Sequence, residues 1–199
     1  MPKRLFDVLV AACALLLASP LMIAIALAVR LESRGPAWFR QDRVGRGGKL
    51  FTILKFRSMY FAPTERGPPL TAANDRRVTA VGSFLRRTKL DELPQLINVL
   101  KGDMSMVGPR PEVPRYVDMY PAELRQAILS VRPGITDEAS IEFRNEDRVL
   151  GDSADAEKTY IEEIMPRKLD LYARYANHHT FLGDLRILRR TLMAVVLGR

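Results

Sequence analysis

Cysteine and histidine are almost absent from this chain, which narrows the chemistry available to it. Its one cysteine, Cys13, lies in an apolar run, so the chain has no disulfide framework and is compatible with a reducing compartment. The two histidines, His178 and His179, are adjacent, and two histidines with a single cysteine argue against a zinc site. Internal repeats and low-complexity tracts are missing too, and 199 residues correspond to about one domain with a real core.

Negative charge is in short supply. The chain has 31 Lys and Arg residues against 23 Asp and Glu residues, a formal net charge of +8. This excess predicts an anionic partner, which could be nucleic acid, acidic membrane lipid or a phosphorylated substrate. Charge alone does not choose between the three.

Charge is nearly missing from residues 5–29, where Asp7 is the only charged residue. At 1.5 Å per residue a helix over this run would be about 37 Å long, enough to cross a hydrocarbon core of about 30 Å. Ser19 and Pro20 interrupt the run near its middle, where proline removes a backbone hydrogen bond. The arm before them, about 22 Å long, is too short to span alone. The whole run is too long for a cleaved signal peptide, and no small-residue cleavage site leads into a polar start.

Basic residues flank this apolar run on both sides, at Lys3 and Arg4 and again at Arg30 and Arg34. A single membrane span usually has a basic excess on one side only. One interpretation is therefore a re-entrant helix that dips into the membrane, bends at its middle and returns to the cytoplasmic face. The other is an ordinary span kinked by proline.

The next segment is basic and rich in glycine. Residues 38–39 and 51–54 are typical of two short strands, and the glycines between them predict a β-hairpin. Trp38 would then lie at headgroup depth and the arginines would meet lipid phosphates, although a solvated basic hairpin explains the same pattern. Lys55 and Arg57 alternate along the second strand, so their side chains are expected on one face.

Residues 85–111 place an acidic pair, Asp91 and Glu92, among basic residues. The apolar spacing that follows predicts an amphipathic helix that starts near Asp91, has Pro94 in its first turn and ends at Gly102. A carboxylate at a helix N-terminus faces unpaired N–H groups, where a phosphate would also bind. The stretch is suited to phosphate chemistry, or the pair is a solvated helix cap.

Arg110 lies between two prolines in the sequence Gly-Pro-Arg-Pro. The prolines stiffen the backbone and restrict the guanidinium group, whose planar fork suits a phosphate or a carboxylate better than a lysine does. A turn with its arginine in water is the alternative.

The remaining patterns are mostly helical. Residues 113–129 predict a helix that restarts at Pro121, and Pro166 opens another. Residues 184–197 predict a helix with apolar side chains on one face and arginines on the opposite face. Such a helix lies on a membrane surface or packs on the core with its arginines in water. The predicted fold is therefore α+β and helix-dominated. We also expect an amphipathic segment over residues 81–88, a loop over 61–73, a turn over 132–136 and an acidic loop over 151–157.

Several long motifs follow one another along the chain. They are KRLFDVLVA with Ser19 and Pro20, then GPAWFRQDRVGRGG, FTILKFRSM, NDRRVTAVGSFLRRTKLDELPQLINVLKGDMSMVGPRP and RPGIT. Together they resemble the bacterial polyprenyl-phosphate phosphoglycosyl transferases of the small monotopic type, the bacterial sugar transferase family. The similarity covers residues 3–136 and resumes through FLGDLRILRRT near the C-terminus. The length matches the minimal catalytic form of that family.

This resemblance implies transfer of a sugar 1-phosphate from a UDP-sugar to polyprenyl (undecaprenyl) phosphate, with release of UMP. Such a transfer is the first membrane step of bacterial glycoconjugate assembly. Asp91 would be the nucleophile that forms a covalent aspartyl-phosphosugar intermediate, Glu92 its acidic partner, and Mg²⁺ would bind at Asp91. Lys55, Arg86 and Arg110 match cationic positions that the family uses at its active site. These cations and the metal would offset the repulsion between a carboxylate and a diphosphate.

The resemblance also implies where the protein lies. Residues 1–34 would form a re-entrant membrane helix broken at Ser19 and Pro20, and residues 35–199 a catalytic domain on the cytoplasmic face of the bacterial inner membrane. This domain would contain the short β-hairpin and amphipathic interfacial helices around a compact catalytic core. Expected partners are the UDP-sugar, polyprenyl phosphate and inner-membrane lipid, with downstream glycosyltransferases as further candidates and no nucleic acid.

One departure and one rival function stay open. After RPGIT many relatives continue with Gly-Trp-Ala-Gln, whereas here residues 137–140 are Asp-Glu-Ala-Ser. Neither this change nor Arg144, which follows it, predicts which sugar the donor carries. The alternative function is a non-catalytic basic membrane-surface protein that binds anionic lipid or nucleic acid. It explains the charge and the apolar run but gives no reason for Asp91 and Glu92 beside the restrained Arg110.

Overall fold

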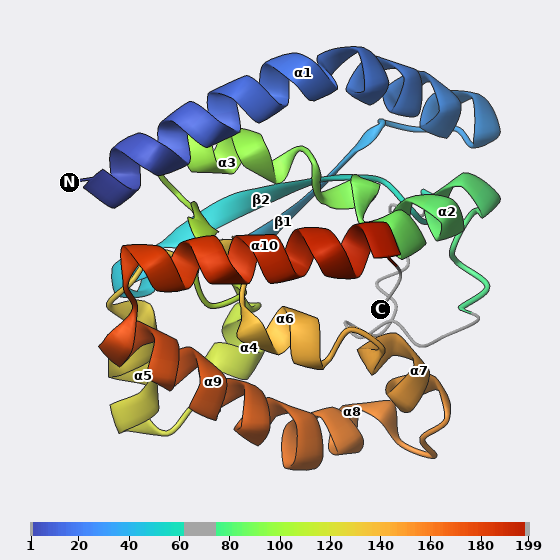
Figure 1. Ribbon diagram of the computed structural model, residues 1–199. Helices are drawn as coiled ribbons and strands as arrows, with labels where there is room; N and C mark the ends of the chain where they lie inside the picture. Colours follow the sequence, from blue (N-terminus) through green and yellow to red (C-terminus); the bar gives the residue numbers. More distant parts are fainter. Residues whose placement is uncertain (1, 62–74, 198–199) are drawn as a thin grey trace.

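The computed structural model describes residues 2–61 and 75–197, and their elements form the predicted helix-dominated α+β fold (Figure 1). The loop predicted over residues 61–73 lies almost wholly outside the described residues. Single turns of 3₁₀ helix are labelled η1 and η2, and η3 is a π-helical turn. In chain order the elements are α1 (Pro2–Glu32), β1 (Trp38–Val44), η1 (Arg46–Gly48), β2 (Leu50–Phe56), α2 (Ala80–Thr88), η2 (Leu90–Glu92), α3 (Gln95–Lys101), β3 (Ser105–Val107), α4 (Pro114–Val117), α5 (Ala122–Leu129), β4 (Gly134–Thr136), α6 (Glu138–Glu142), α7 (Glu146–Gly151), α8 (Ala156–Thr159), η3 (Tyr160–Ile164), α9 (Met165–His178) and α10 (Phe181–Leu197).

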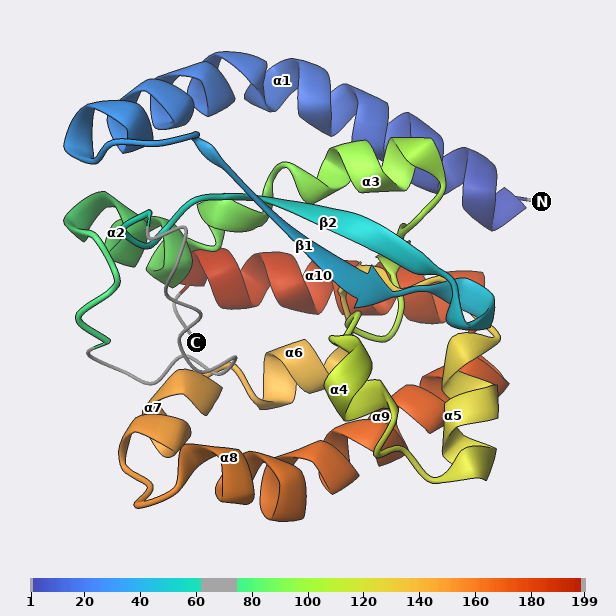
Figure 2. The same ribbon diagram turned by 180° about the vertical axis from the view of Figure 1, so that it is seen from behind.

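α1 is one long helix that runs as an arch along one edge of the molecule (Figures 1 and 2). Pro20 lies inside it and has no N–H to bond to the carbonyl of Leu16, but the Ser19 hydroxyl donates to that carbonyl at 2.8 Å. The helix therefore bends without ending. Its length and apolar composition suffice to cross a membrane, and Leu17 and Leu31 are 80% and 86% exposed. The re-entrant path itself stays a prediction.

Both ends of α1 are bonded to the same compact body. At its start, Lys3 Nζ donates to Asp184 Oδ2 of α10 at 2.6 Å. Just beyond its end, the carbonyl of Ser33 accepts from the buried Arg57 guanidinium at 2.7 Å. Two ends held on one body are compatible with a helix that enters and leaves a membrane on the same side.

β1 and β2 form the predicted hairpin. They pair antiparallel with Trp38 opposite Phe56, and these two rings stack with their centroids 5.0 Å apart. In the connecting turn Gly47 and Gly48 have φ values of +69° and +78°, in the left-handed region that favours glycine. The depth of Trp38 in a membrane is not tested by this packing.

Lys55 and Arg57 contact different parts of the molecule. β2 ends at Phe56, so Arg57 lies beyond the strand and its side chain is buried against the end of α1. Lys55 is bonded to Glu92 instead. Of these two alternating cations, Lys55 is the one that reaches the acidic pair.

β3 and β4 form a second pair of strands that the sequence did not indicate. The pair is parallel, with Ser105 opposite Gly134, so the turn predicted over residues 132–136 is wrong for its last three residues. Gly134 is required because a Cβ on it would lie 2.1 Å from the backbone nitrogen of Gly108. Strands of three residues whose partners are distant in sequence leave no local periodicity to detect.

The described residues form three apolar clusters. Two of them, around α1 and β2, make up the first core, and the one around α9 makes up the second core. α10 lies between these two parts of the fold (Figures 1 and 2). On one side α3 packs against α1 and β2, and on the other α4, α5 and η3 pack with α9. α10 contacts β3, β4 and α6 between them. The acidic pair comes from the first part of the fold, and Arg110 directly precedes the helices of the second.

Helix predictions beyond residue 112 are confirmed in outline. Residues 113–129 form α4 and α5, separated at Pro121, and α9 begins one residue before Pro166. α10 starts three residues earlier than predicted, and its contact with a membrane surface is still an expectation. α6, α7 and α8 occupy residues that the sequence left unassigned or assigned to an acidic loop.

Candidate active site

The acidic pair lies in η2, one turn ahead of α3. The helix predicted to start near Asp91 begins later, at Gln95, so the predicted boundary is wrong. The physical reason is Pro94, which has no N–H to donate back to the carbonyl of Leu90 in an α-helical pattern. Gly102 ends α3 with a φ of +94°, as predicted.

Both carboxylate oxygens of Glu92 are bonded to cations. Arg110 Nη1 donates to Oε2 at 3.2 Å and Arg110 Nη2 donates to Oε1, a two-pronged pairing that suits the guanidinium fork. Lys55 Nζ, from β2, donates to Oε1 at 3.1 Å. One acid thus brings together two cations that the sequence indicated separately.

The charges in this cluster shift its pKa values in opposite directions. Burial by itself would raise the pKa of Glu92, but the charges of Arg110 and Lys55 outweigh it and hold that pKa well below its ordinary value. The charge of Glu92 raises the pKa of Arg110 well above its ordinary value. Burial lowers the pKa of Lys55, and the charge of Glu92 offsets part of that effect. Glu92 is therefore an anion at neutral pH and Arg110 a cation.

Asp91 differs from its neighbour because one of its oxygens lacks a partner. The residue is 7% exposed, and within the described part of the chain its Oδ1 has no hydrogen-bond partner. Burial raises the pKa of the Asp91 carboxyl, against the opposing charge of Lys55. A buried polar atom without a partner is unfavourable in the folded protein. It is a candidate contact for a ligand, a cation or an electrophile.

Arg86 lies in the last turn of α2, which ends just before η2. The hydrogen bonds from Arg77 contribute most to lowering the pKa of Asp75, and the charge of Arg86 adds to this effect. The structure thus places Arg86 next to η2 along the chain and within electrostatic reach of Asp75. Its contact with a substrate stays a prediction.

The acidic pair offers a suitable oxygen for the expected Mg²⁺. This ion prefers oxygen ligands and often takes one or two carboxylates together with substrate phosphates and water. Asp91 Oδ1 is such an oxygen, whereas both oxygens of Glu92 are already bonded to Arg110 and Lys55. Across residues 2–61 and 75–197, no group of three or more His, Cys, Asp or Glu side chains could hold a metal. Mg²⁺ at this site would therefore depend on Asp91 and on the substrate.

The segment that departs from Gly-Trp-Ala-Gln lies near Arg110. Asp137 is buried and caps α6 by accepting from the Ser140 N–H at 2.8 Å and the Ser140 hydroxyl at 2.6 Å. Burial raises the pKa of Asp137, and its charge adds to the larger effect of Glu92 on the pKa of Arg110. Arg144 Nη1, after α6, donates to a backbone carbonyl of α10. Asp is a favoured N-cap residue, and this preference could have identified Asp137 as the start of a helix from the sequence.

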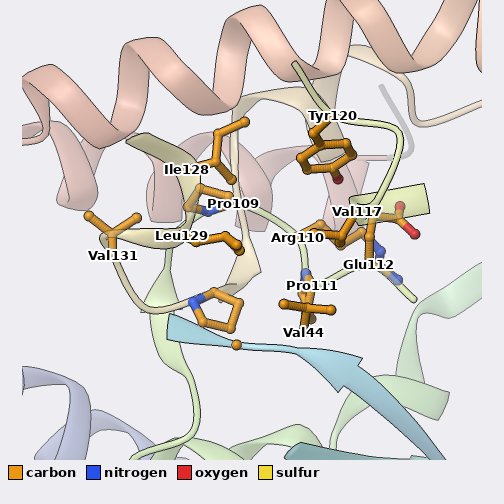
Figure 3. A pocket seen from close by; sticks show the side chains of 12 residues that line it. Val44, Pro109, Arg110, Pro111, Glu112, Val117, Tyr120, Ile128, Leu129 and Val131 are labelled. Atoms are coloured by element: carbon orange, nitrogen blue, oxygen red, sulfur yellow. The ribbon is translucent and has the colours of Figure 1, made fainter. Parts of the chain in front are cut away.

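A pocket opens beside the turn that carries Arg110 (Figure 3). Arg110 and Glu112 contribute to its wall, which is otherwise mostly apolar and includes Val44 and Val117. Neither residue of the acidic pair lines it. Of the candidate site residues, this pocket includes only Arg110.

Comparisons with known proteins extend over nearly the whole chain. A sequence model of the family described as bacterial sugar transferase matches residues 1–198. The UDP-N-acetylgalactosamine-undecaprenyl-phosphate N-acetylgalactosaminephosphotransferase of Aeromonas hydrophila is 40% identical over 98% of this chain and 44% of its own length. The UDP-glucose:undecaprenyl-phosphate glucose-1-phosphate transferase of Caulobacter vibrioides is 41% identical over 98% of this chain and 69% of its own length. A protein of the same name from Escherichia coli is 40% identical over 96% of this chain and 39% of its own length. The chain thus spans less than half the length of two of these relatives.

Proposed function

This chain belongs to the bacterial sugar transferase family, and we propose that it transfers a sugar 1-phosphate from a UDP-sugar to undecaprenyl phosphate and releases UMP. The names of the relatives support the class of donor and acceptor, and they differ in the sugar. The observation that carries the proposal is the contrast within the acidic pair. Glu92 holds Arg110 and Lys55, while Asp91 keeps a buried oxygen without a partner among the described residues.

Asp91 is the nucleophile in the proposed reaction. Its carboxylate attacks the phosphorus that bears the sugar, the bond from this phosphorus to UMP breaks, and UMP leaves with the bonding electrons. An oxygen of undecaprenyl phosphate then attacks the same phosphorus, and the bond to Asp91 breaks. The products are the undecaprenyl-diphosphate sugar and the regenerated carboxylate. The raised pKa of the buried Asp91 supports this role, because a more basic carboxylate is a stronger nucleophile.

Glu92 holds the cations that the donor needs. Attack by Glu92 itself would require it to give up bonds from Arg110 and Lys55 at both oxygens. These two cations, with Arg86 as a third, would instead stabilise the negative charge on the diphosphate. Bound Mg²⁺, held by Asp91, would supply further charge neutralisation there.

α1 accounts for access to a lipid acceptor. We propose that residues 1–34 enter the bacterial inner membrane from its cytoplasmic face and return to it, while residues 35–199 stay on that face. The bonds from Lys3 and Arg57 that hold both ends of α1 to one body support this path, since a straight span would place its ends on opposite sides. The exposed leucines of α1 would then face lipid, and the phosphate of the acceptor would stay at the interface.

UMP release by the full chain tests the proposal. The protein in lipid nanodiscs would be incubated with Mg²⁺, undecaprenyl phosphate and a panel of UDP-sugars. We expect repeated turnover that requires both substrates with at least one donor. A basic membrane-surface protein that only binds anionic lipid or nucleic acid would bind vesicles and release no UMP. Absence of UMP with every donor would therefore contradict the transferase.

A further inference from the structure

The turn that carries Arg110 has few hydrogen-bond donors of its own, because both neighbours of Arg110 are prolines. On one side it is held by β4, where the N–H of Gly134 donates to the carbonyl of Pro109 at 3.0 Å. On the other side it is held by β1, where the N–H of Val44 donates to the carbonyl of Glu112 at 2.9 Å. Arg110 thus lies between two anchored points.

Arg43, near the end of β1, is a cation whose donors are already used. Its Nε and Nη2 donate to Gln41 Oε1 at 3.1 and 2.7 Å. Its Nη1 donates to the carbonyl of Pro111 at 3.1 Å and to Glu112 Oε2 at 3.4 Å. These bonds occupy most of the five donors of a guanidinium group. Arg43 is therefore suited to hold the turn and not to bind a substrate phosphate.

The Glu112 carboxylate ties the turn to the second core as well. Its Oε1 accepts from the hydroxyl of Tyr160 at 2.8 Å, while its Oε2 accepts from Arg43. Burial, with a smaller contribution from the charge of Glu112, raises the pKa of the Tyr160 hydroxyl, so the hydroxyl stays a donor. The ring of Tyr160 packs on Tyr116 with centroids 4.9 Å apart. Figure 3 shows Glu112 and Arg110 together at the edge of the pocket.

We propose that Arg43, Glu112 and Tyr160 form a brace that sets the direction of the Arg110 guanidinium, and that Glu112 is a positioning residue for the transfer. This inference rests on the proposed function, because its effect appears in turnover. Arg110 has to meet an incoming phosphate with a guanidinium that is already bonded to Glu92, and a two-pronged contact tolerates little displacement. The brace bonds to the backbone on the C-terminal side of Arg110, whereas the Arg110 guanidinium is bonded to Glu92. Its effect on catalysis therefore passes through Arg110.

A double-mutant cycle in the full chain tests this route. Glu112→Gln keeps an acceptor for Tyr160 but loses the charge that pairs with Arg43, and we expect kcat for UMP release to fall about tenfold. In an Arg110→Lys background the same change should lower the residual kcat about twofold at most. The lysine ammonium is a point charge, so its contact with a phosphate depends little on the direction that the brace sets. Equal fold losses in both backgrounds would show a general structural role and overturn the proposal.

A gentler variant and a matched control complete the cycle. Tyr160→Phe removes one hydrogen bond and keeps the packed ring, so it serves if Glu112→Gln does not fold. We expect about a threefold fall in kcat that also disappears in the Arg110→Lys background.

Asp118→Asn removes a carboxylate from an exposed pair with Arg125, whose Nη2 lies 3.1 Å from Asp118 Oδ1. It should leave kcat unchanged.

Backbone amide hydrogen exchange tests the brace independently of catalytic turnover. The amides of Gly108, Arg110, Glu112 and Val113 should exchange faster in Glu112→Gln than in the unmodified protein, and Asp118→Asn should not change them. If the unmodified protein releases no UMP with any donor, the proposed function fails, and exchange alone decides whether the brace orders the turn. Unchanged exchange in Glu112→Gln would overturn the brace in either case.

Discussion

Two clusters of buried acids, one at the start of α1 and one in η2, differ in how their oxygens are satisfied. In the first, Asp7 and Asp184 are each 2% exposed, and each carboxylate accepts hydrogen bonds at both oxygens. The donors are Lys3, Tyr175, Ser105 and the backbone N–H of Met106. In the second, Glu92 is bonded as fully, but Asp91 Oδ1 has no partner in the described part of the chain.

This difference separates acids that hold the fold from an acid that is suited to a ligand. When a buried carboxylate has partners at both oxygens, removal of one of those hydrogen bonds lowers the stability of the folded protein. A buried oxygen without a partner destabilises the folded state, and such groups are found where function uses them. We therefore expect changes in the first cluster to lower stability and changes at Asp91 to lower activity.

The largest effect should come from Asp91→Asn. We expect kcat for UMP release to fall at least about a thousandfold, because the nucleophile is lost, with little change in thermal stability. The protein with Asp91 would be incubated with a productive UDP-sugar and Mg²⁺ but without acceptor. Its peptide that contains Asp91 should then gain the mass of one sugar phosphate. The peptide from Asp91→Asn should not gain it.

Kinetics with both substrates check the same role independently. A covalent intermediate requires UMP to leave before the acceptor reacts, which gives parallel double-reciprocal plots and a burst of UMP. No adduct, no burst and intersecting plots with a productive donor would limit Asp91 to holding Mg²⁺. The contrast between the two acid clusters would then concern metal binding and not nucleophilic attack.

Arg110→Lys should have the next largest effect. The substitution keeps the charge but replaces the fork that pairs with both oxygens of Glu92 by a point charge, and we expect kcat/KM to fall about thirtyfold. Arg125→Lys makes the same change in an exposed pair and is the control. Turnover of Arg110→Lys close to that of the control would show that geometry at this position does not matter.

Asp7→Asn should lower the stability of the protein and leave its turnover nearly unchanged. Asp7 accepts from the Ser105 hydroxyl and from a backbone N–H of β3, and we expect the free energy of unfolding to fall by about 2 kcal/mol. Denaturant unfolding in detergent measures this change, and kcat per folded molecule should stay within about twofold. A large loss of kcat at unchanged stability would remove the division between the two clusters.

The smallest effect concerns the path of α1. With Cys13→Ala as background, a membrane-impermeant thiol reagent should label both Pro2→Cys and Arg34→Cys from the cytoplasmic side. Adding Pro20→Ala should shift only a minority of molecules to a spanning form, because the bonds of Lys3 still hold the start of the helix to α10. Labelling of Pro2→Cys only from the periplasmic side, without Pro20→Ala, would rule out the re-entrant path.

Most helices and the hairpin could be predicted from the sequence because their signals are local. The apolar run indicated α1, the glycines placed the hairpin turn, Gly102 ended α3, and Pro121 and Pro166 marked the starts of helices. The acidic pair and the cations around it were recognised as candidates from residue chemistry and from motifs in order. These features depend on neighbours a few residues apart, where spacing and side-chain type carry the physical information.

Only the tertiary structure decided which of these residues meet and which atoms are bonded. It paired β3 with β4 in place of a predicted turn, directed Arg57 to the end of α1, and revealed the bonds of Arg43 and Glu112 behind Arg110. It also distinguished two adjacent acids that look alike in the sequence, by bonding both oxygens of Glu92 and leaving one of Asp91 without a partner among the described residues. Such contacts join segments far apart along the chain, and burial and hydrogen bonding at a single oxygen exist only once those segments are packed together.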